Sequence, residues 1–291
     1  MKPKVTIGIC VRNSESFIEE AIDSIINQDY QHELMEVILV DDGSTDRTLQ
    51  VILFAIPKMK MGVKVFHQRW KGLGATRNTV VDNARGDYIV WVDGDMILSH
   101  DYIRKLVEFM DENLDVGIAK GKYELTPGDN WLSTLEIYSR AASKMVDFNC
   151  GAKAYSRSLG TGGSIYRIEA LKQIRGFDEN LRGYGEDWDA ECRIRKTGWS
   201  FYTTNVQFRD YERRGITWND LWYRNVKRGY GLHNFLEKNR GMINLYKMLP
   251  PAAFLSGLFH ALTIYKLTHR KIVFLLPLQY IFKASALWLG Y

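Results

Sequence analysis

Apolar segments with strand-like and helix-like spacing alternate along the first third of the chain. Continuous apolar, mainly β-branched runs occur at 5–11, 35–40, 63–66 and 88–92, and a stretch with helical apolar spacing follows each run, the first at 15–28. Continuous apolar runs are typical of strands that are buried on both faces, as in parallel sheets. The β-α-β rhythm therefore predicts an α/β fold, with a mostly parallel sheet and helices on both faces.

The later part of the chain is less regular. Its patterns predict helices at 131–146, 187–196 and 218–236, and strands at 164–166 and 200–208. A length of 291 residues fits one large α/β domain with an appendage. We place the boundary near residue 216, so that 1–216 forms the main domain and 217–291 a helical C-terminal extension.

Charge is distributed unevenly along the chain. Residues 207–291 contain 13 Lys and Arg against 4 Asp and Glu, a net charge of +9, which leaves 26 basic and 30 acidic residues, a net charge of −4, for the rest. A basic tail favours an anionic partner, either a membrane surface or a nucleic acid. No nucleic-acid recognition motif accompanies it, which argues against nucleic acid. The three cysteines lie far apart, which argues against a disulfide scaffold or a structural zinc site and favours a reducing compartment.

Polar segments follow three of the expected strands. They are Arg12-Asn13, Asp41-Asp42-Gly43-Ser44 and Asp93-Gly94-Asp95. In open parallel sheets, ligands bind beyond the carboxyl ends of the strands. We therefore expect these three segments to lie together at a ligand site.

Asp93-Gly94-Asp95 is the sharpest of these motifs. Two carboxylates in a tight turn can reach one hard cation, and Mg²⁺ and Mn²⁺ prefer oxygen ligands that they share with substrate phosphates. The alternative is a surface turn that uses Asp and Gly for their turn preference. Two interpretations also apply to Asp41 and Asp42. Their carboxylates could accept hydrogen bonds from a ribose or a base, or they could form a helix cap and turn.

Two glycine-containing segments carry further chemistry. In 183–188, Glu186 and Asp187 stand beside aromatic residues, as suits a general base, although acids are also favoured in the first turn of a helix. In 71–78, glycines and cations precede a helix and could hold a diphosphate, but the segment lacks the pattern of a P-loop or of a dinucleotide fold. A solvated helix start is its alternative.

Together these motifs resemble the family 2 glycosyltransferases with the GT-A fold. The resemblance covers residues 4–208 and rests on V-T-I-G-I-C-V-R-N, V-D-D-G-S-T-D, G-x-x-x-x-R-N, V-D-G-D, G-F-D-E and G-E-D, in that order. Arg12 replaces the tyrosine frequent at its place, and Cys10 the usual proline. The Q-x-x-R-W motif of processive synthases is not seen, which argues against polymer synthesis.

The resemblance implies a role for each matching residue. Asp187 is implied as the general base, and Asp93 and Asp95 as ligands of a divalent metal, Mn²⁺ or Mg²⁺. The residues implied to bind the nucleotide sugar are Arg12, Asp41, Asp42, Lys71, Arg77 and Asp93. Those implied to contact the acceptor or to support the base are Tyr184, Glu186 and Trp188.

The sequence thus favours an inverting, metal-dependent glycosyltransferase that uses a nucleotide sugar, with UDP-sugars preferred. Two alternatives stay open. One is a catalytically silent scaffold that binds a sugar nucleotide or a membrane, and the other is a nucleotidyltransferase. The latter would favour a glycine-rich loop with a basic residue directly after the first strand, where the sequence has 11–14, V-R-N-S.

The C-terminal extension contains two apolar runs, 249–265 and 272–282, on either side of a basic turn that includes Lys266 and Arg270. A transmembrane hairpin would put this turn outside the cell, against the tendency of basic residues to stay in the cytosol. We therefore expect helices lying in the interface, on the cytoplasmic face of the cell membrane, with basic residues among anionic headgroups. A lipid-linked or glycan acceptor would follow. The alternative is that these helices pack on the main domain.

Overall fold

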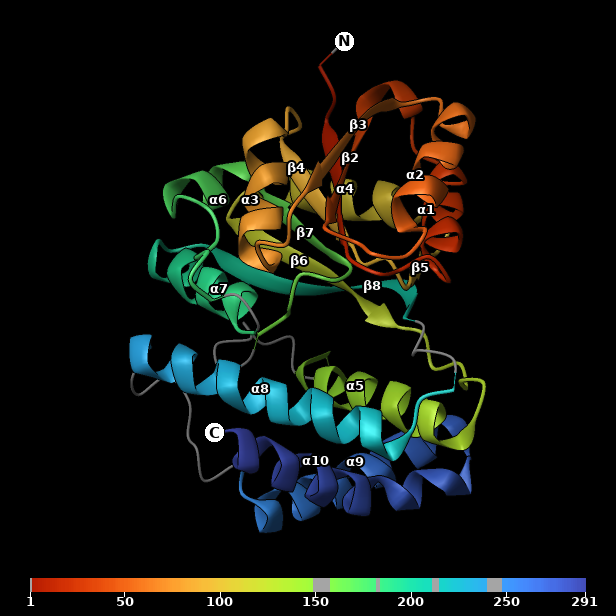
Figure 1. The fold of residues 1–291 in the computed structure, drawn as a ribbon, viewed down its shortest axis with the longest axis vertical. Coiled ribbons are helices and arrows are strands. Elements are labelled where there is room, and N and C mark those ends of the chain that lie inside the picture. The colour runs from red at the N-terminus through yellow and green to blue at the C-terminus, as the bar shows by residue number, and fades with distance from the viewer. Residues whose placement is uncertain (1, 149–157, 182–183, 211–214, 240–247) are drawn as a thin grey trace. The chain divides into compact units, whose positions relative to one another are not determined.

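The computed structural model describes residues 2–148, 158–181, 184–210, 215–239 and 248–291 (Figure 1). The chain divides into two compact units. The first comprises Met1–Lys122, Gly151–Arg182 and Glu186–Asp210, and the second comprises Tyr123–Cys150, Gly183–Gly185 and Tyr211–Tyr291. The second unit therefore takes in the helix after residue 130, which the sequence prediction left within 1–216, in addition to the C-terminal helices.

The first unit is built on a sheet of eight strands among its described residues. The strands are β1 (Val5–Val11), β2 (Met35–Asp42), β3 (Gly62–Gln68), β4 (Tyr88–Val92), β5 (Met96–Leu98), β6 (Val116–Tyr123), β7 (Ser164–Arg167) and β8 (Ser200–Asp210). Their order in the sheet is β3-β2-β1-β4-β7-β6-β8-β5. The pairs from β3 to β4 are parallel, as predicted, whereas β7 pairs antiparallel with β4 and β6, and β5 pairs antiparallel with β8.

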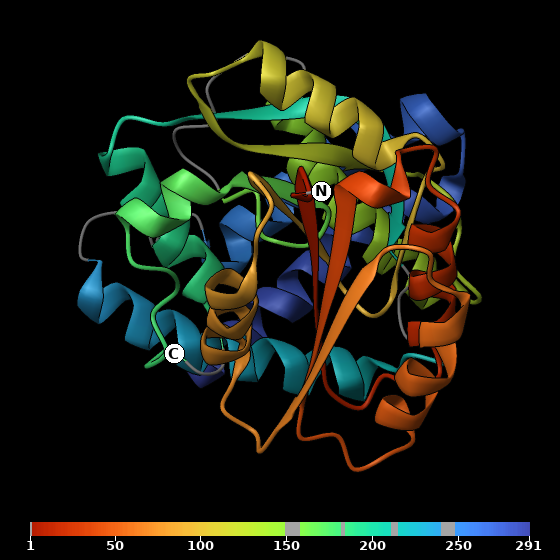
Figure 2. The ribbon, with the colours of Figure 1, turned by 90° about the horizontal axis from the view of Figure 1, so that it is seen from above.

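Helices cover both faces of the parallel strands, with α1 and α2 on one face and α3 on the other (Figure 2). The helices of this unit are α1 (Ile18–Ile26), η1 (His32–Leu34), α2 (Thr48–Ala55), η2 (Ile56–Lys58), α3 (Leu73–Asn83), α4 (Tyr102–Glu112), α6 (Ile168–Gln173) and α7 (Glu186–Lys196). The strands β5 and β6 and the helix α6 were not predicted. β5 and α6 are short, and β6 carries glycines and lysines that break its apolar run.

The carboxyl ends of three parallel strands meet where the chain changes direction across the sheet. β1 lies between β2 and β4, and Val11 at the end of β1 is paired with Asp41 of β2. Ile9 of β1 is paired with Val92, the last residue of β4. Such a switch point is where open α/β sheets bind their ligands.

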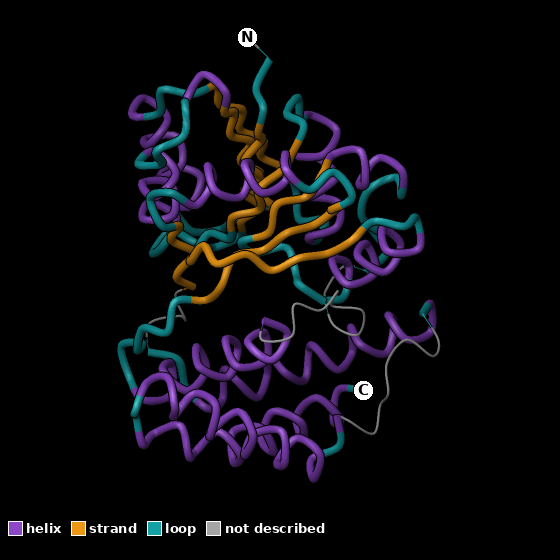
Figure 3. The backbone as a smooth tube through the Cα atoms, turned by 180° about the vertical axis from the view of Figure 1, so that it is seen from behind, coloured by secondary structure: helices purple, strands orange, loops and turns teal. Residues whose placement is uncertain are grey.

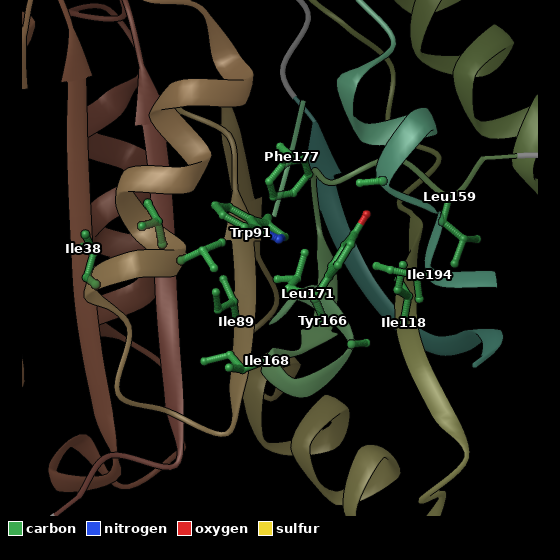
Figure 4. Close-up of a cluster of buried hydrophobic side chains, with 14 of the residues drawn as sticks. Ile38, Ile89, Trp91, Ile118, Leu159, Tyr166, Ile168, Leu171, Phe177 and Ile194 are labelled. Atoms are coloured by element: carbon green, nitrogen blue, oxygen red, sulfur yellow. The ribbon is translucent and has the colours of Figure 1, made fainter. Parts of the chain in front are cut away.

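Aromatic rings pack under this edge of the sheet (Figure 4). Trp91 of β4 contacts Tyr166 and Phe177 edge-on, with ring centroids 6.4 Å and 5.6 Å apart. The surrounding buried residues include Ile38, Ile118 and several others of the same cluster. Edge-to-face aromatic pairs add stability beyond the area that they bury and give this core a defined geometry.

The second unit is built from helices (Figure 3). They are α5 (Trp131–Phe148), α8 (Trp218–Lys238), α9 (Pro250–Thr268), η4 (Lys271–Leu275) and α10 (Leu276–Gly290). Leu135 and Tyr138 of α5 pack with Ala261 and Ile264 of α9 and with Leu276 of α10. Thr217 caps α8, since its hydroxyl oxygen accepts a hydrogen bond from the amide of Asp220 at 3.2 Å.

Candidate active site

Asp41 is fully buried at the end of β2. Its Oδ2 lies 2.8 Å from Nδ1 of His67, which is paired with it in the register of β2 and β3. Its Oδ1 accepts hydrogen bonds from the amide of Ser44, at 3.2 Å, and from the Ser44 hydroxyl. Both carboxylate oxygens of Asp41 are therefore held by the protein itself, and they shape the turn after β2.

Asp42 ties the loop before α3 to the sheet. Its Oδ1 accepts hydrogen bonds from the amide of Lys71 and from Nε2 of Gln68, each at 2.9 Å, and its Oδ2 accepts one from the amide of Gly72 at 2.9 Å. Only 5% of Asp42 is exposed. The sequence prediction placed Lys71 in the nucleotide site, and the contact to Asp42 comes from its main chain, while the residue as a whole is exposed.

Arg12 lies beside an aromatic residue that the sequence analysis did not select. Its guanidinium carbon is 5.5 Å from the ring centroid of Trp70, and 51% of Trp70 is exposed. An arginine and an exposed indole at the carboxyl edge of the sheet form a flat surface on which a base could stack. The signal in the sequence was a tryptophan directly before Lys71 and the glycines.

Asp93 follows β4, and Asp95 immediately precedes β5. Asp93 is half-buried, and no described residue donates a hydrogen bond to its carboxylate. A methyl group on Gly162 would overlap Asp93 Oδ2, so this glycine leaves the carboxylate its space. Hard oxygen donors such as these fit Mg²⁺ or Mn²⁺. The described residues hold no cluster of three or more side chains that could bind a metal.

Arg77 of α3 and Glu186, the first residue of α7, form a buried ion pair. Burial by itself lowers the pKa of Arg77, but the carboxylates of Glu186, Asp187 and Asp93 outweigh it and raise that pKa above its usual value. Burial raises the pKa of Glu186, against the charge of Arg77, and the like charge of Asp187 adds to the increase. We take Arg77 to be permanently charged, because arginine does not lose its proton in proteins.

Asp187 lies in the first turn of α7 and is half-buried. Its Oδ1 accepts a hydrogen bond from the amide of Trp188 at 2.8 Å. On the other side, a methyl group on Gly160 would lie 3.5 Å from Asp187 Oδ2. Tyr184 belongs to the second unit, where it packs closely against Gly231 of α8.

Several charged residues at the ends of the strands influence the pKa of Cys10 in β1. Loss of hydration raises the pKa of the Cys10 thiol to about 12, and the charges of Asp93, Asp42 and Glu186 contribute to the increase, whereas Arg77 opposes it. Asp42, Asp93 and both members of the Arg77–Glu186 ion pair thus all act on one thiol near the end of β1. Cys10 stays protonated and is no nucleophile at neutral pH.

The arrangement defines an α/β sheet whose acidic strand ends form a single polar edge, as in nucleotide-sugar-binding GT-A domains. The profile described as "Glycosyl transferase family 2" matches residues 6–174, more than half of the chain, and the chain belongs to this family.

Curated relatives match parts of the chain. An uncharacterized glycosyltransferase of Haemophilus influenzae is 37% identical over 111 residues, which are 38% of this chain and 44% of that protein. The uncharacterized glycosyltransferase EpsJ of Bacillus subtilis is 40% identical over 117 residues, 40% of this chain and 33% of EpsJ. The poly(ribitol-phosphate) beta-N-acetylglucosaminyltransferase TarS of Staphylococcus aureus is 28% identical over 185 residues, 62% of this chain and 32% of TarS. The matches thus span less than half the length of these relatives.

Solved structures share the fold. The mannosyltransferase PcManGT of Pyrobaculum calidifontis, in complex with GDP-Man and Mn²⁺, superposes with a TM-score of 0.65 at 20% identity, covering 99% of this chain and 88% of that one. S. aureus TarS 1–349 in complex with UDP superposes with a TM-score of 0.54 at 18% identity, covering 98% and 90%. The predicted GT-A fold is confirmed.

Proposed function

We propose that this protein is an inverting glycosyltransferase that moves a sugar from a nucleotide-diphosphate sugar to an acceptor hydroxyl. The observation that carries the proposal is the segment Gly160–Gly163, which runs from Asp187 to Asp93. Gly160 lies against the carboxylate of Asp187 and Gly162 against that of Asp93. An acid suited to the donor diphosphate and an acid suited to the acceptor proton therefore border the same stretch of backbone.

The donor would bind along the carboxyl ends of β1, β2 and β4. In the proposal, Asp41 and Asp42 shape the base and ribose site through the loops that they hold, because both carboxylates are buried and already accept hydrogen bonds. Arg12 and Trp70 offer a stacking surface, whereas Arg77 is buried in its ion pair with Glu186 and acts through the position of α7. The complexes of PcManGT with GDP-Man and of TarS with UDP leave both bases open, and we favour a UDP-sugar.

Asp93 and Asp95 would hold Mn²⁺ or Mg²⁺. When bound, such an ion neutralises charge on a leaving diphosphate. The presence of Mn²⁺ in the complex of PcManGT supports this cofactor, as do the two hard carboxylates of this chain.

Asp187 would take the proton of the acceptor hydroxyl. A general base needs an accessible oxygen, and Asp187 is half-buried, whereas the neighbouring Glu186 is 3% exposed and paired with Arg77. A carboxylate locked in a buried ion pair is poorly placed to attack the sugar covalently. In the proposal, Asp187 acts as a base in a single displacement with inversion.

The second unit supports action at a membrane. α9 directs its apolar residues outward, with Leu255, Leu258 and Leu262 exposed by 66%, 45% and 53%. In the interior of the same unit, Glu136 is fully buried and bonds to Lys283 Nζ at 2.8 Å and to Gln279 Nε2 at 3.2 Å. The interior of this unit is thus an apolar core with one buried polar cluster, and the exposed leucines of α9 form an apolar outer surface of the kind that marks contact with a membrane or a protein.

One helical segment of the described residues, Lys271–Gly290, is long and apolar enough to cross a membrane, with a mean hydropathy of 1.6. Lys266 lies in the last turn of α9, and the basic residues Arg270 and Lys271 follow the helix. In the proposal, 217–291 therefore lies on the cytoplasmic face of the cell membrane, next to a lipid-linked or glycan acceptor.

The proposal is tested by incubating the purified chain with UDP- and GDP-sugars, with Mn²⁺ or Mg²⁺, and measuring release of the nucleoside diphosphate. Polyprenyl phosphates and simple glycans serve as acceptors. We expect release with one donor class, and we expect the acceptor to increase it. A chain that binds no nucleotide and releases none with any donor would contradict the proposal.

A further inference from the structure

Leu159 lies between two buried side chains of opposite charge. Oε2 of Glu191 accepts a hydrogen bond from the Leu159 amide at 2.9 Å, and Nζ of Lys120 donates one to the Leu159 carbonyl at 2.7 Å. Oε1 of Glu191 also accepts a hydrogen bond from the amide of Gly160 at 2.7 Å. Lys120 is 3% exposed and Glu191 is fully buried. A carboxylate and an ammonium thus hold one stretch of backbone from both sides.

Burying two charged side chains in this way is unfavourable for the free energy of folding. Removing a charged group from water costs several kcal/mol, and apolar side chains of similar size would fill the space at lower cost. Hydrogen bonds that involve a charged partner, however, are short and strong, and they fix a loop more firmly than neutral ones. The pair of Lys120 and Glu191 is therefore better explained by the position that it gives to the backbone than by stability.

The backbone held in this way leads directly to the two acids. Gly160 has a φ of +70°, and a methyl group there would lie 3.5 Å from Asp187 Oδ2 and 3.8 Å from Lys120 Nζ. The ammonium and that carboxylate oxygen are therefore at most about 7.3 Å apart, the sum of the two distances. Lys120 and Glu191, which hold the backbone at Leu159 from both sides, are called the clamp below. Glu191 stands one turn after Asp187 on α7, so the same helix carries the proposed base and one residue of the clamp.

The other end of the segment is fixed to the sheet. The amide of Gly163 donates a hydrogen bond to the carbonyl of Trp91 at 2.9 Å, and the hydroxyl of Tyr102 donates to the Gly163 carbonyl. Between the two anchors, no described residue accepts a hydrogen bond from the amide of Thr161 or of Gly162. Within the part of the chain that the structure describes, these two main-chain donors are therefore available to a ligand between the acids.

We propose that Lys120 and Glu191 are positioning residues for the transferred sugar. They fix the segment Gly160–Gly163, and the amides of Thr161 and Gly162 donate hydrogen bonds to oxygen atoms of the sugar. This inference rests on the proposed function, because it requires a sugar between Asp93 and Asp187. It adds the part of the chain that sets the sugar's orientation.

The test compares Lys120→Met and Glu191→Gln with the control Lys122→Met. Lys122 is two residues further along β6 and bonds to the side chain of Asn205 instead. Hydrogen exchange should become at least about tenfold faster at Leu159 and Gly160 in the two clamp variants only, because opening of the loop is then easier. Since a misplacement of about 1 Å can cost a factor of about 100, we expect kcat to fall by about 10- to 100-fold.

Measurements of binding affinity distinguish an effect on the sugar site from an effect on the nucleotide site. Both clamp variants should bind the free nucleoside diphosphate as the wild type does, and they should lose the additional affinity that the wild type has for the nucleotide sugar. Faster exchange with unchanged kcat and unchanged sugar affinity would overturn the inference, and so would unchanged exchange. If neither variant folds, Ser158→Ala removes the 3.0 Å bond from its hydroxyl to Glu191 and the 3.1 Å bond that this hydroxyl accepts from the Gly160 amide, and it should show the same changes more weakly. A wild-type chain without transfer to any acceptor would instead refute the proposed function.

Discussion

Arg77 and Glu186 stand 109 residues apart in the chain and form a buried ion pair. Arg77 belongs to α3, which begins at the loop held by Asp42, and Glu186 begins the helix that carries Asp187. The pair therefore connects the proposed nucleotide side of the first unit with the proposed base. The guanidinium carbon of Arg77 also lies 5.6 Å from the ring centroid of Phe177, which belongs to the aromatic core.

Arg77→Met should destabilise the first unit. It leaves the Glu186 carboxylate buried without its counter-charge, and breaking a buried pair in this way costs about 3–5 kcal/mol. The double variant Arg77→Met/Glu186→Leu should recover part of this loss, because no charge is then left buried. Urea unfolding of the three proteins gives the comparison. A single variant as stable as the wild type would show that the pair does not matter for stability.

Asp187→Asn should abolish transfer and leave donor binding intact. The amide cannot take a proton from the acceptor, and a general base contributes about 10²- to 10⁴-fold to the rate. The measurements are kcat for transfer and the affinity for the nucleoside diphosphate. Asp82→Asn, an exposed change on α3, is the control. A variant of Asp187 with more than half of the wild-type turnover would assign the base elsewhere.

Asp95→Ala should remove the effect of Mn²⁺ on binding of the nucleoside diphosphate. With one of the two carboxylates gone, the turn after β4 offers the ion a single oxygen ligand side chain, which is too few for a shared site. Calorimetry with and without Mn²⁺ measures the difference. The affinity without metal should be equal in the variant and the wild type, and persistence of the Mn²⁺ effect would exclude this role for Asp95.

Glu136→Gln should destabilise the second unit in a pH-dependent way. Burial alone raises the pKa of Glu136, but Lys283, Arg140 and Arg224 outweigh it and lower the pKa from 4.5 to about 2. The folded state thus favours the ionised form, so this stabilisation is present above pH 4.5 and is lost as the pH falls towards 2. At about 1.4 kcal/mol per pKa unit, it amounts to about 3 kcal/mol.

Urea unfolding of the wild type and Glu136→Gln checks this prediction. The difference in free energy of unfolding between the two should be largest near pH 6 and should shrink at pH 3.5. Comparison of the two proteins at each pH removes the contribution of other titrating groups. A difference that does not change with pH would mean that the carboxylate of Glu136 is not preferentially ionised in the folded state.

The chain should float with anionic liposomes at low salt, and added salt should weaken the binding. Leu258→Asp/Leu262→Asp places charges on the exposed apolar side of α9 and should prevent flotation. Leu114→Asp changes a residue that is 72% exposed in the first unit and should have no effect. Full-length protein that stays unbound at low salt would refute membrane docking.

Much of the fold was predictable from local patterns. Apolar runs and helical spacing predicted the strands β1 to β4 and the helices between them. Residues buried on both faces of a parallel sheet must be apolar along their whole length, as in β1, β2 and β4, whereas β3 at the sheet edge is only partly buried. The antiparallel half was less visible. β6 contains Lys120 and two glycines, and nothing local indicates that this lysine is buried against the carbonyl of a residue 39 positions later.

The candidate site divides in the same way. The sequence by itself determined the residue types, because Asp93, Asp95 and Asp187 stand in short motifs whose chemistry can be read locally. Only the tertiary structure decided that Arg77 pairs with Glu186 and that Asp42 holds the loop at Gly72. The same is true of the hydrogen bonds from Lys120 and to Glu191 that fix the backbone of Leu159. These contacts join residues that are distant in the chain. Their formation depends on how strands and helices pack, and a local pattern carries no information about which distant side chain a buried charge will meet.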